Sequence, residues 1–344
     1  MQKNITIKDI ARKFKCSPST VSRALNDHPL INQETKNTIK EYAERMGYQK
    51  NEVSLSLLNK TTKTIGIVVP SILHSHETLI IEGIKSKLHQ LGFMLMICVT
   101  EENTDTEVKF LSSLGANRVA AVFISVARET QKSGNYAHLE YLQKKGVPVI
   151  LIDREIGSSD FHSVTVDDYL GAYMATQHLI DVGCRQIAHL AGPQHLEQSQ
   201  ARKKGYMDAL TANKLPVDHT YIIDCSFNIE SALEPTKALL KLPKRPDGIF
   251  SVNDYTSYGA IQVLKELGVS VPEDICVAGF DNIPLSTYFD PALTTIDRQS
   301  FEIGVKASKY LLKLLADEEL DVPHYIFKPE LIIRNSTKVL QEAP

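Results

Sequence analysis

Near its start the sequence places four hydroxyl side chains and one guanidinium within seven residues. The run reads Ser17-Pro18-Ser19-Thr20-Val21-Ser22-Arg23. Hydroxyl groups can contact phosphates or base edges of DNA, and a guanidinium can pair bidentately with guanine. The spacing of Val21, Ala24 and Leu25 predicts a helix with these three residues on its apolar side. The hydroxyls and Arg23 then face outward, as insertion into a DNA major groove requires.

Two short helices are needed to hold these groups. Thr6, followed three residues later by Asp9, forms a capping-box pattern that opens the first helix. Ser17 can cap the second helix, which begins at Pro18, where the missing amide hydrogen is not needed. The pair is typical of a helix-turn-helix. An ordinary pair of amphipathic helices has the same spacing, so the pattern alone leaves both interpretations open.

A third helix is expected after Asn32 and Thr35. Its apolar positions recur at helical spacing and are Ile39, Tyr42, Ala43 and Met46. Gly47 is expected to end this helix, because glycine readily adopts the left-handed conformation that closes many helices. Three such helices can share one small core, which predicts a headpiece spanning residues 1–60.

The run from Thr6 to Asn26 resembles the head of the lactose/galactose repressor (LacI/GalR) family. The family signature is close to T-[IL]-x-D-[IV]-A-x-x-x-x-V-S-x-x-T-V-S-R-x-[LV]-N, and Cys16 stands where valine is usual. The resemblance implies sequence-specific binding of double-stranded operator DNA. The DNA-binding residues that it indicates are Thr6, Ser17, Pro18, Ser19, Thr20, Ser22, Arg23, Asn26 and Leu57.

The same resemblance implies a hinge helix over about residues 51–58. In the family this helix enters the minor groove and wedges a leucine between base pairs, and Leu57 occupies the matching position. Lys50 replaces the usual proline, and Leu55 replaces the common arginine or glutamine. A plain amphipathic linker helix therefore remains the alternative.

Charge is distributed unevenly along the 344 residues. Residues 1–60 hold eleven Lys and Arg against six Asp and Glu, whereas the remainder holds 27 against 35. A basic head on an acidic body fits a module that binds a polyanion, attached to a part that does not. With 43% hydrophobic and 23% charged residues, the chain is expected to be a soluble protein of two or three domains.

The five cysteines are Cys16, Cys98, Cys184, Cys225 and Cys276, and none forms a C-x-x-C pair. Their scatter predicts free thiols in a reducing compartment rather than disulfides or a zinc site. The polar N-terminus and the lack of a long apolar run predict a cytoplasmic protein with no membrane partner. Dinucleotide, P-loop, nucleophile-elbow and redox motifs are absent from the sequence, so neither a cofactor nor an enzymatic activity is expected.

From Thr64 onward, short apolar strands alternate with helices. The expected strands are 64–69, 93–99, 120–125, 147–152, 186–191, 221–225, 248–252 and 275–280. Such runs predict doubly wound parallel sheets, and their number predicts two lobes over residues 61–344. Crossings between lobes are expected at Val164–Val166, Leu293–Asp297 and after Pro323. The fold class is therefore an all-α headpiece plus an α/β body that resembles the periplasmic sugar-binding-protein fold.

Ligands of open α/β sheets bind beyond the carboxyl ends of the strands. Polar side chains stand at those ends, namely Ser71, Asp153, Arg154, Asn253, Asp254, Asp281 and Asn282. Each one alone could simply cap a helix. Their convergence between two lobes predicts a cleft that closes over a small molecule.

Family resemblance extends this set. Ser199 to Tyr206 matches S-x-x-R-x-x-G-[FYW], in which the arginine, here Arg202, grips the effector. Asp281 matches the aspartate of G-[FY]-D, and Phe227 stands where the family places a stacking aromatic. His76 and Glu77 replace aromatic residues common in the family, so a more polar wall is expected. The effector-binding residues are thus Ser71, His76, Glu77, Asp153, Arg154, Arg202, Phe227, Asn253 and Asp281.

The run His74-Ser75-His76-Glu77 also has the residue types of a metal site. No second cluster is evident to complete the coordination, so effector contacts or loop residues are the favoured interpretation and no metal is expected.

The resulting hypothesis is a ligand-responsive transcription regulator, a repressor of a carbohydrate-utilisation operon. As the resemblance implies, its effector is a sugar or sugar derivative. A homodimer is expected, because two recognition helices match a pseudo-palindromic operator. Leu79, Ile80, Gly83 and Ile84 are either dimer contacts or core residues. The alternatives are an activator, a regulator that depends on a protein corepressor, a sugar-binding transport protein and an α/β enzyme.

Overall fold

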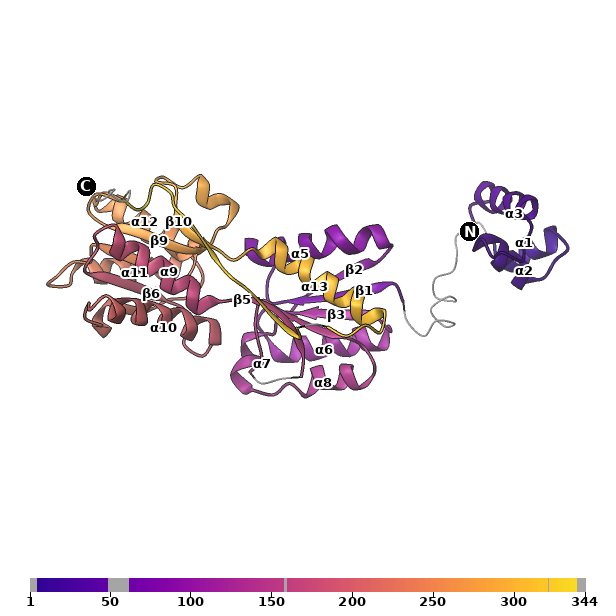
Figure 1. Ribbon diagram of the computed structural model, residues 1–344, viewed down its shortest axis with the longest axis horizontal. Coiled ribbons are helices and arrows are strands. Elements are labelled where there is room, and N and C mark those ends of the chain that lie inside the picture. Colours follow the sequence, from indigo (N-terminus) through magenta and orange to yellow (C-terminus); the bar gives the residue numbers. More distant parts are fainter. Residues whose placement is uncertain (1–4, 49–61, 158–159, 321, 339–344) are drawn as a thin grey trace. The chain divides into compact units, whose positions relative to one another are not determined.

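The computed structural model describes residues 5–48, 62–157, 160–320 and 322–338 (Figure 1). The chain divides into two compact units, Met1–Thr62 and Lys63–Pro344, which we call the headpiece and the body. The expected hinge helix at about 51–58, with Lys50, Leu55 and Leu57, lies outside the described residues.

The described part of the headpiece contains three helices, α1 (Ile7–Lys13), α2 (Pro18–Leu25) and α3 (Gln33–Arg45). The two expected N-caps, Thr6 and Ser17, are confirmed, whereas the third helix begins before Thr35 rather than after it. The Thr6 hydroxyl accepts from the Asp9 backbone N–H while the Asp9 carboxylate accepts from the Thr6 N–H at 3.0 Å. Ser17 accepts from the Thr20 N–H at 3.1 Å, and Asn32 caps α3. The chain thus satisfies several N–H groups that each helix start leaves without a helical partner.

A small apolar core joins these helices. Its buried members are Ile10, Ala11, Val21, Ala24, Ile39 and Ala43. Phe14 and Tyr42 add an edge-to-face ring contact at 5.3 Å between centroids. The expected burial of Met46 is wrong, since this side chain is 48% exposed. Met46 is the C-cap that follows the last residue of α3, so it leaves the apolar face that Ile39 and Ala43 share.

The first lobe of the body is built on a six-stranded sheet in which all neighbours are parallel. Its strands, in spatial order, are β11 (His324–Phe327), β5 (His162–Val166), β4 (Val149–Ile152), β3 (Ala121–Ile124), β1 (Thr64–Val69) and β2 (Met94–Val99). Its helices are α5 (Ser75–Leu88), η1 (His89–Leu91), α6 (Thr104–Ala116), α7 (Arg128–Ser133), α8 (Ala137–Lys144) and α13 (Ser300–Leu315). Apolar cores form on both faces of the sheet, which explains why its strands are almost wholly apolar.

The second lobe has a sheet of the same size. Its strands, in spatial order, are β12 (Glu330–Ile332), β10 (Thr294–Asp297), β9 (Cys276–Asp281), β8 (Gly248–Ser251), β6 (Ile187–Ala191) and β7 (Ile222–Asp224). Its helices are α9 (Asp168–Asp181), α10 (Glu197–Ala212), η2 (His219–Tyr221), α11 (Glu230–Leu240), α12 (Asp254–Glu266) and η3 (Pro284–Thr287). Strand β12 pairs antiparallel with β10, so the expectation of wholly parallel sheets fails at this edge. The chain reaches β12 directly from β11, without the helix that a parallel return requires.

The chain passes between the lobes three times, at the positions expected from the sequence. It leaves the first lobe between β5 and α9, returns between β10 and α13, and leaves again between β11 and β12. Figure 1 shows these strands running between the two halves of the body. Each crossing joins the carboxyl end of a strand to the other lobe, and the polar residues at those ends are therefore brought together.

Helices α5 and α13 pack with their backbones in contact. A Cβ on Gly83 would lie 2.1 Å from the carbonyl oxygen of Phe301, and one on Gly304 would lie 2.1 Å from that of Ile80. Ile80 and Ile84 are buried in the same core. Of the two interpretations of this face, core packing is therefore the one observed for Ile80, Gly83 and Ile84, while Leu79 stays partly exposed.

All five cysteines are free, and Cys98, Cys184, Cys225 and Cys276 are buried. No helix in the described part of the chain combines the length and the apolarity needed to span a membrane.

Candidate functional site

Helix α2 exposes the polar side chains that the sequence singled out. Ser19 and Arg23 are exposed, whereas Thr20 and Ser22 are half-buried. No carboxylate in the described residues pairs with Arg23. Its guanidinium is therefore available to an anion or to a base edge.

The other residues predicted to bind DNA lie at the ends of α1 and α2. Thr6 donates its hydroxyl to Asp9 at 2.6 Å, and Ser17 lies 2.9 Å from the Thr20 hydroxyl, so both already serve as helix caps. Pro18 and Asn26 are exposed at the two ends of α2. These residues orient the helix at least as much as they offer contacts.

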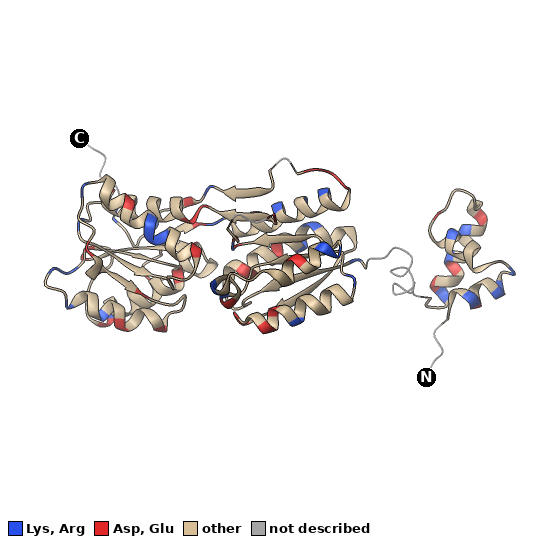
Figure 2. Ribbon diagram, turned by 90° about the horizontal axis from the view of Figure 1, so that it is seen from below, with Lys and Arg blue, Asp and Glu red and all other residues tan. Residues whose placement is uncertain are grey.

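Most lysines and arginines in the described part of the headpiece are exposed. Figure 2 shows their positions along the ribbon in blue. Lys8, Lys13 and Lys15 are exposed, and no carboxylate in the described part of the headpiece pairs with them. By contrast, Lys40 is held by Asp27 at 2.6 Å. Unpaired surface cations beside a protruding helix are typical of a nucleic-acid interface.

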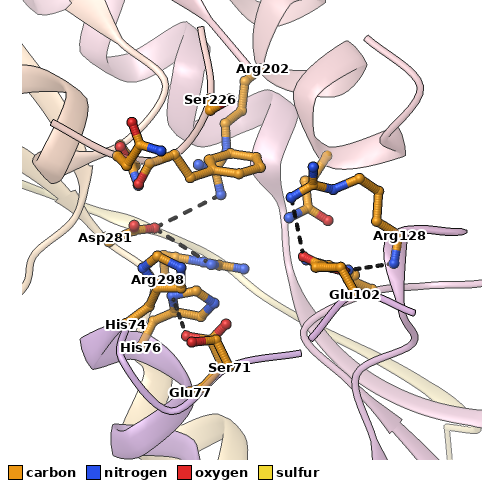
Figure 3. A pocket seen from close by; sticks show the side chains of 15 residues that line it. Ser71, His74, His76, Glu77, Glu102, Arg128, Arg202, Ser226, Asp281 and Arg298 are labelled. Atoms are coloured by element: carbon orange, nitrogen blue, oxygen red, sulfur yellow. Dashed lines mark hydrogen bonds and ion pairs between the residues drawn. The ribbon is translucent and has the colours of Figure 1, made fainter. Parts of the chain in front are cut away.

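The body contains a cavity of about 240 Å³ lined by residues from both lobes (Figure 3). We call it the cleft. Eight of the nine predicted effector-binding residues line it, namely Ser71, His76, Glu77, Arg154, Arg202, Phe227, Asn253 and Asp281. The ninth, Asp153, does not line the cleft but lies behind it, paired with Arg298. Asp254 is also withdrawn, because it is buried and holds Thr295 and the Ile283 N–H.

Seven further residues line the cleft, namely His74, Glu102, Arg128, Gln198, Ser226, Asn228 and Arg298. His74 belongs to the run for which effector contacts were one of the two favoured interpretations, whereas the other six were not predicted. Four of them follow strands within a few residues, since Glu102 follows β2, Arg128 follows β3, Ser226 follows β7 and Arg298 follows β10. The strand-end rule applied to every strand finds these four.

On the first-lobe side of the cleft, Glu102 contacts two arginines, Arg154 and Arg128. Arg154 makes a two-pronged contact, with both terminal nitrogens 2.8 Å from the two carboxylate oxygens. Arg154 also donates to the carbonyl of Val126 at 2.8 Å. The backbone N–H of Arg128 donates to the same carboxylate at 2.6 Å. The bound arginines lower the pKa of Glu102 although burial alone would raise it. Glu102 is therefore ionised, and its contacts fix the orientation of the Arg154 side chain in this wall of the cleft.

Arg202 on α10 is 1% exposed and fully engaged. Its Nε and one terminal nitrogen contact the Asp168 carboxylate at 2.8 and 2.7 Å, and the other terminal nitrogen donates to the carbonyl of Val252. The guanidinium lies over the Phe280 ring at 3.7 Å, and its terminal nitrogen is 3.9 Å from Asp281. Arg202 thus faces the cleft with its orientation already fixed.

Arg298 links the two lobes at the centre of the site. It follows β10 of the second lobe and forms an ion pair with Asp153, which follows β4 of the first lobe. Its other terminal nitrogen lies 3.5 Å from Asp281 at the end of β9 (Figure 3). Burial alone would raise the pKa of Asp153, but Arg298 and His76 hold it well below its ordinary value. The pair is ionised and buried, so losing one partner would leave a costly charge.

His76 and Glu77 at the start of α5 form a coupled pair. The His76 Nδ1 lies 3.1 Å from Glu77, and its Nε2 lies 3.7 Å from Asp153. Burial raises the pKa of Glu77 to about 7. Burial opposes protonation of His76, but the two carboxylates outweigh it and raise its pKa. In the described residues no group of three His, Cys, Asp or Glu is placed to hold a metal ion.

The second lobe contributes an aromatic face to this polar cavity. Asn253 donates from its amide to the carbonyl of Phe227 at 3.1 Å, while its amide oxygen caps α12 by accepting from the Thr256 N–H. Asn253 therefore holds Phe227 in place. An aromatic ring with charged neighbours suits a ligand with an apolar face and polar edges.

Unusual backbone conformations lie at the ends of two strands that meet at the site. Asp153 has φ +67°, Asp281 has φ +113° and Asn282 has φ +49°. Non-glycine residues rarely adopt such angles, and they concentrate at functional sites. Here the angles accompany the two carboxylates that Arg298 joins.

Comparison with known proteins gives one consistent result. Residues 6–51 match the model of bacterial regulatory proteins of the lacI family, and residues 176–337 match a periplasmic binding protein-like domain. Catabolite control protein A of Priestia megaterium is 32% identical over 97% of this chain and 100% of the relative. The HTH-type transcriptional repressor PurR of Actinobacillus pleuropneumoniae is 32% identical over 98% of this chain and 99% of the relative.

Solved structures agree on the fold. The Lac repressor dimer bound to operator and the anti-inducer ONPF has a TM-score of 0.86 at 23% identity, covering 98% of this chain and 100% of that one. A LacI family transcriptional regulator from Enterococcus faecium with bound ribose has a TM-score of 0.71 at 28% identity, covering 81% of this chain and 100% of that one.

Proposed function

Because the chain belongs to the LacI family of bacterial regulatory proteins, we propose that it represses transcription by binding an operator and releases or retains that operator according to the effector in its cleft. The observation that carries this proposal is the combination of two features in one chain: Arg23, exposed on a capped helix and without a carboxylate partner among the described residues, and a cleft lined by both lobes of the body. In this scheme Ser19, Thr20, Ser22 and Arg23 read the major groove, and Leu57 enters the minor groove.

The proposed effector is a sugar or sugar derivative. The cleft offers both donors and acceptors, since the buried Nε atoms of Arg128, Arg154 and Arg298 have no hydrogen-bond partner in the described residues and the Asp281 carboxylate lines the same cavity. Buried polar atoms of this kind are costly unless a ligand or water satisfies them. Alternating hydroxyls can serve as both donor and acceptor, and Phe227 can cover the apolar face of a sugar ring. The 240 Å³ cavity is below the usual range of about 300–1,000 Å³ for drug-sized ligands, which favours a small sugar.

Arg298 is the proposed coupling element. It joins Asp153 of one lobe to Asp281 of the other, so an effector that contacts these groups biases how the lobes close. An effector can shift the lobes only by the difference between its affinities for the two arrangements, typically about 1–3 kcal/mol.

We propose a homodimer that contacts through the first lobe. The edge strand β2 exposes Met94, Met96 and Ile97, with exposed fractions of 64%, 41% and 47%. An unpaired strand edge with apolar side chains is unusual on a monomer surface. Sedimentation velocity of Met96→Asp tests this, and an unchanged dimer would place the interface elsewhere.

We propose that DNA binding resides in residues 1–60 and effector binding in residues 61–344, which differ by two residues from the bounds of the headpiece and the body. We also propose that the protein acts on DNA in the cytoplasm, and we assign it no catalytic role or cofactor.

Electrophoretic mobility-shift titration tests the central proposal. Purified full chain is titrated against DNA flanking its own gene, with and without each member of a sugar panel. Specific retention that a sugar alters is the expected result. Failure to discriminate that DNA from random duplex at any condition would overturn the proposal, and a reporter strain lacking the gene separates repression from activation.

A further inference from the structure

A second cavity, of about 280 Å³, lies beside the cleft in the body. Arg154 and Gln198 line both cavities. The walls of the second one come from both lobes, with Gln131 of α7 on the first and Ala201 of α10 on the second. The crossing from β5 to α9 also lines it. We call it the crossing pocket.

Five carboxylates line the crossing pocket, and three of them lack a cationic partner. Asp153 and Asp168 are ion-paired with Arg298 and Arg202. No Lys or Arg in the described residues forms an ion pair with Glu155, Asp167 or Glu197. The Glu155 carboxylate accepts only the Thr165 hydroxyl at 2.8 Å, and Asp167 caps α9. Burial and the neighbouring Glu155 raise the pKa of Glu197. Arg154, the one cation among the lining residues, is already bound to Glu102.

Two buried amide oxygens add to this acceptor-rich lining. Gln131 and Gln198 are each 9% exposed, and the Oε1 of each has no hydrogen-bond partner. The Nε2 of Gln131 donates to the carbonyl of Glu155 at 3.3 Å, which orients its free oxygen. Buried acceptors without a partner are costly and call for a donor. The negative charge of the carboxylates and the free amide oxygens would both be satisfied by the same kind of ligand, a cation that carries several N–H groups.

A metal ion fits this pocket poorly. No group of three His, Cys, Asp or Glu in the described part of the chain is placed to ligate one ion. Carboxylates that do not converge on one ion suit a molecule that carries separated charges.

We infer that the crossing pocket binds a small organic ammonium compound, of the class of short alkyl diamines, at a site distinct from the cleft. Its ammonium groups donate to Glu155 and Glu197, and its N–H groups also satisfy the amide oxygens of Gln131 and Gln198. Since the pocket takes its walls from both lobes and lies against one of the crossings between them, the ligand holds the lobes together without occupying the cleft.

Isothermal titration calorimetry of the full chain tests this inference. The probe is 1,4-diaminobutane, and 1,4-butanediol is the uncharged control of similar length. One diamine is expected to bind per chain, with no heat from the diol. Glu197→Gln is expected to weaken diamine binding by roughly tenfold, because the amide oxygen can still accept the hydrogen bond but the charge that strengthens it is lost.

Glu230→Gln is the matched control, because Glu197 and Glu230 are both exposed and each is the first residue of a helix in the same lobe. Gln131→Leu removes one orphaned oxygen and is expected to weaken diamine binding without lowering the thermal stability of the chain. A purely structural role for Gln131 would lower stability instead.

The outcome also separates this pocket from the cleft. Phe227→Ala is expected to leave diamine affinity unchanged, because Phe227 lines only the cleft of the two cavities. Equal heats for diamine and diol, equal effects of the two glutamate variants, or loss of diamine binding in Phe227→Ala would each overturn the inference.

Discussion

The outward face of α2 and the interlobe cleft use arginine in opposite ways. Arg23 is exposed and has no carboxylate partner in the described residues, whereas Arg154, Arg202 and Arg298 are almost fully buried and each is held by a carboxylate. An exposed cation without a carboxylate partner can bind an anion such as a DNA phosphate. That binding is mainly electrostatic and therefore weakens as the salt concentration rises. A buried, paired cation offers direction rather than net charge, so it favours a neutral ligand of matching shape. The difference explains how one chain can read DNA with one region and a small polar molecule with the other.

The largest test of this contrast removes a buried charge. Arg298→Ala leaves Asp153 ionised without its main partner, so the free energy of unfolding of the body is expected to fall by about 3–5 kcal/mol. Lys40→Ala breaks an exposed pair with Asp27 in the headpiece and is expected to cost less than about 1 kcal/mol. Urea denaturation followed by circular dichroism measures both. Equal losses would remove the distinction between the two regions.

The next test removes the free charge. Arg23→Ala is expected to lower operator affinity by about 1–3 kcal/mol, since one bidentate base contact is lost, while the cleft keeps its effector affinity. Arg45→Ala, at the last residue of α3, is the control and is expected to have a smaller effect. Fluorescence anisotropy at two salt concentrations measures the affinities. Operator binding that is insensitive to both Arg23 and salt would contradict the assignment of α2.

Within the cleft, the aromatic face is expected to contribute less than the buried ion pairs. Phe227→Ala should weaken the binding of a responsive sugar by roughly tenfold, because stacking contact is lost. DNA binding without the sugar should stay unchanged. Calorimetry with the sugar found by panel screening provides the number, and unaltered sugar affinity would mean that the ligand lies elsewhere.

The smallest expected effect is the pH dependence of stability that Glu77 causes. Glu77 has a pKa of about 7 in the fold against an ordinary value of 4.5, so the folded state binds more protons between these values. Its contribution to stability is fully present below about pH 4.5 and is lost as pH rises through 7. His76, whose pKa is also raised, acts in the same direction. Glu77→Gln should reduce the fall in stability between pH 6 and 7 by about 1 kcal/mol. Denaturation curves with parallel pH profiles for both proteins would contradict this.

Much of the local structure could be predicted because it depends on neighbours in the sequence. Thr6, Ser17 and Asn32 cap helices through residues three positions away, and the apolar runs became strands within one or two residues of their expected ends. The strand-end rule placed four residues at the cavity, namely Ser71, Arg154, Asn253 and Asp281, and the family resemblance supplied the other four.

What escaped prediction depends on contacts between distant segments. Asp153 follows a strand, as Arg154 does, but it does not line the cleft because it pairs with Arg298, 145 residues later in the sequence. The antiparallel direction of β12 depends on β10, more than thirty residues earlier. The apolar pattern of α5 predicts a packed face, yet only the structure shows that Gly304 of α13 covers it. The crossing pocket combines Gln131, Glu155 and Glu197, which no local motif joins.

Because the chain passes between the lobes three times, few truncations of the protein can leave a complete lobe. Neither lobe corresponds to a continuous stretch of codons, because α13 and β11 complete the first lobe after most of the second has been made. A premature stop codon before residue 300 would deprive the first lobe of its covering helix and both sheets of an edge strand. Truncation is thus expected to abolish effector binding completely rather than leave one working lobe. A fragment that contains a single lobe must be made by joining segments that are separate in the sequence.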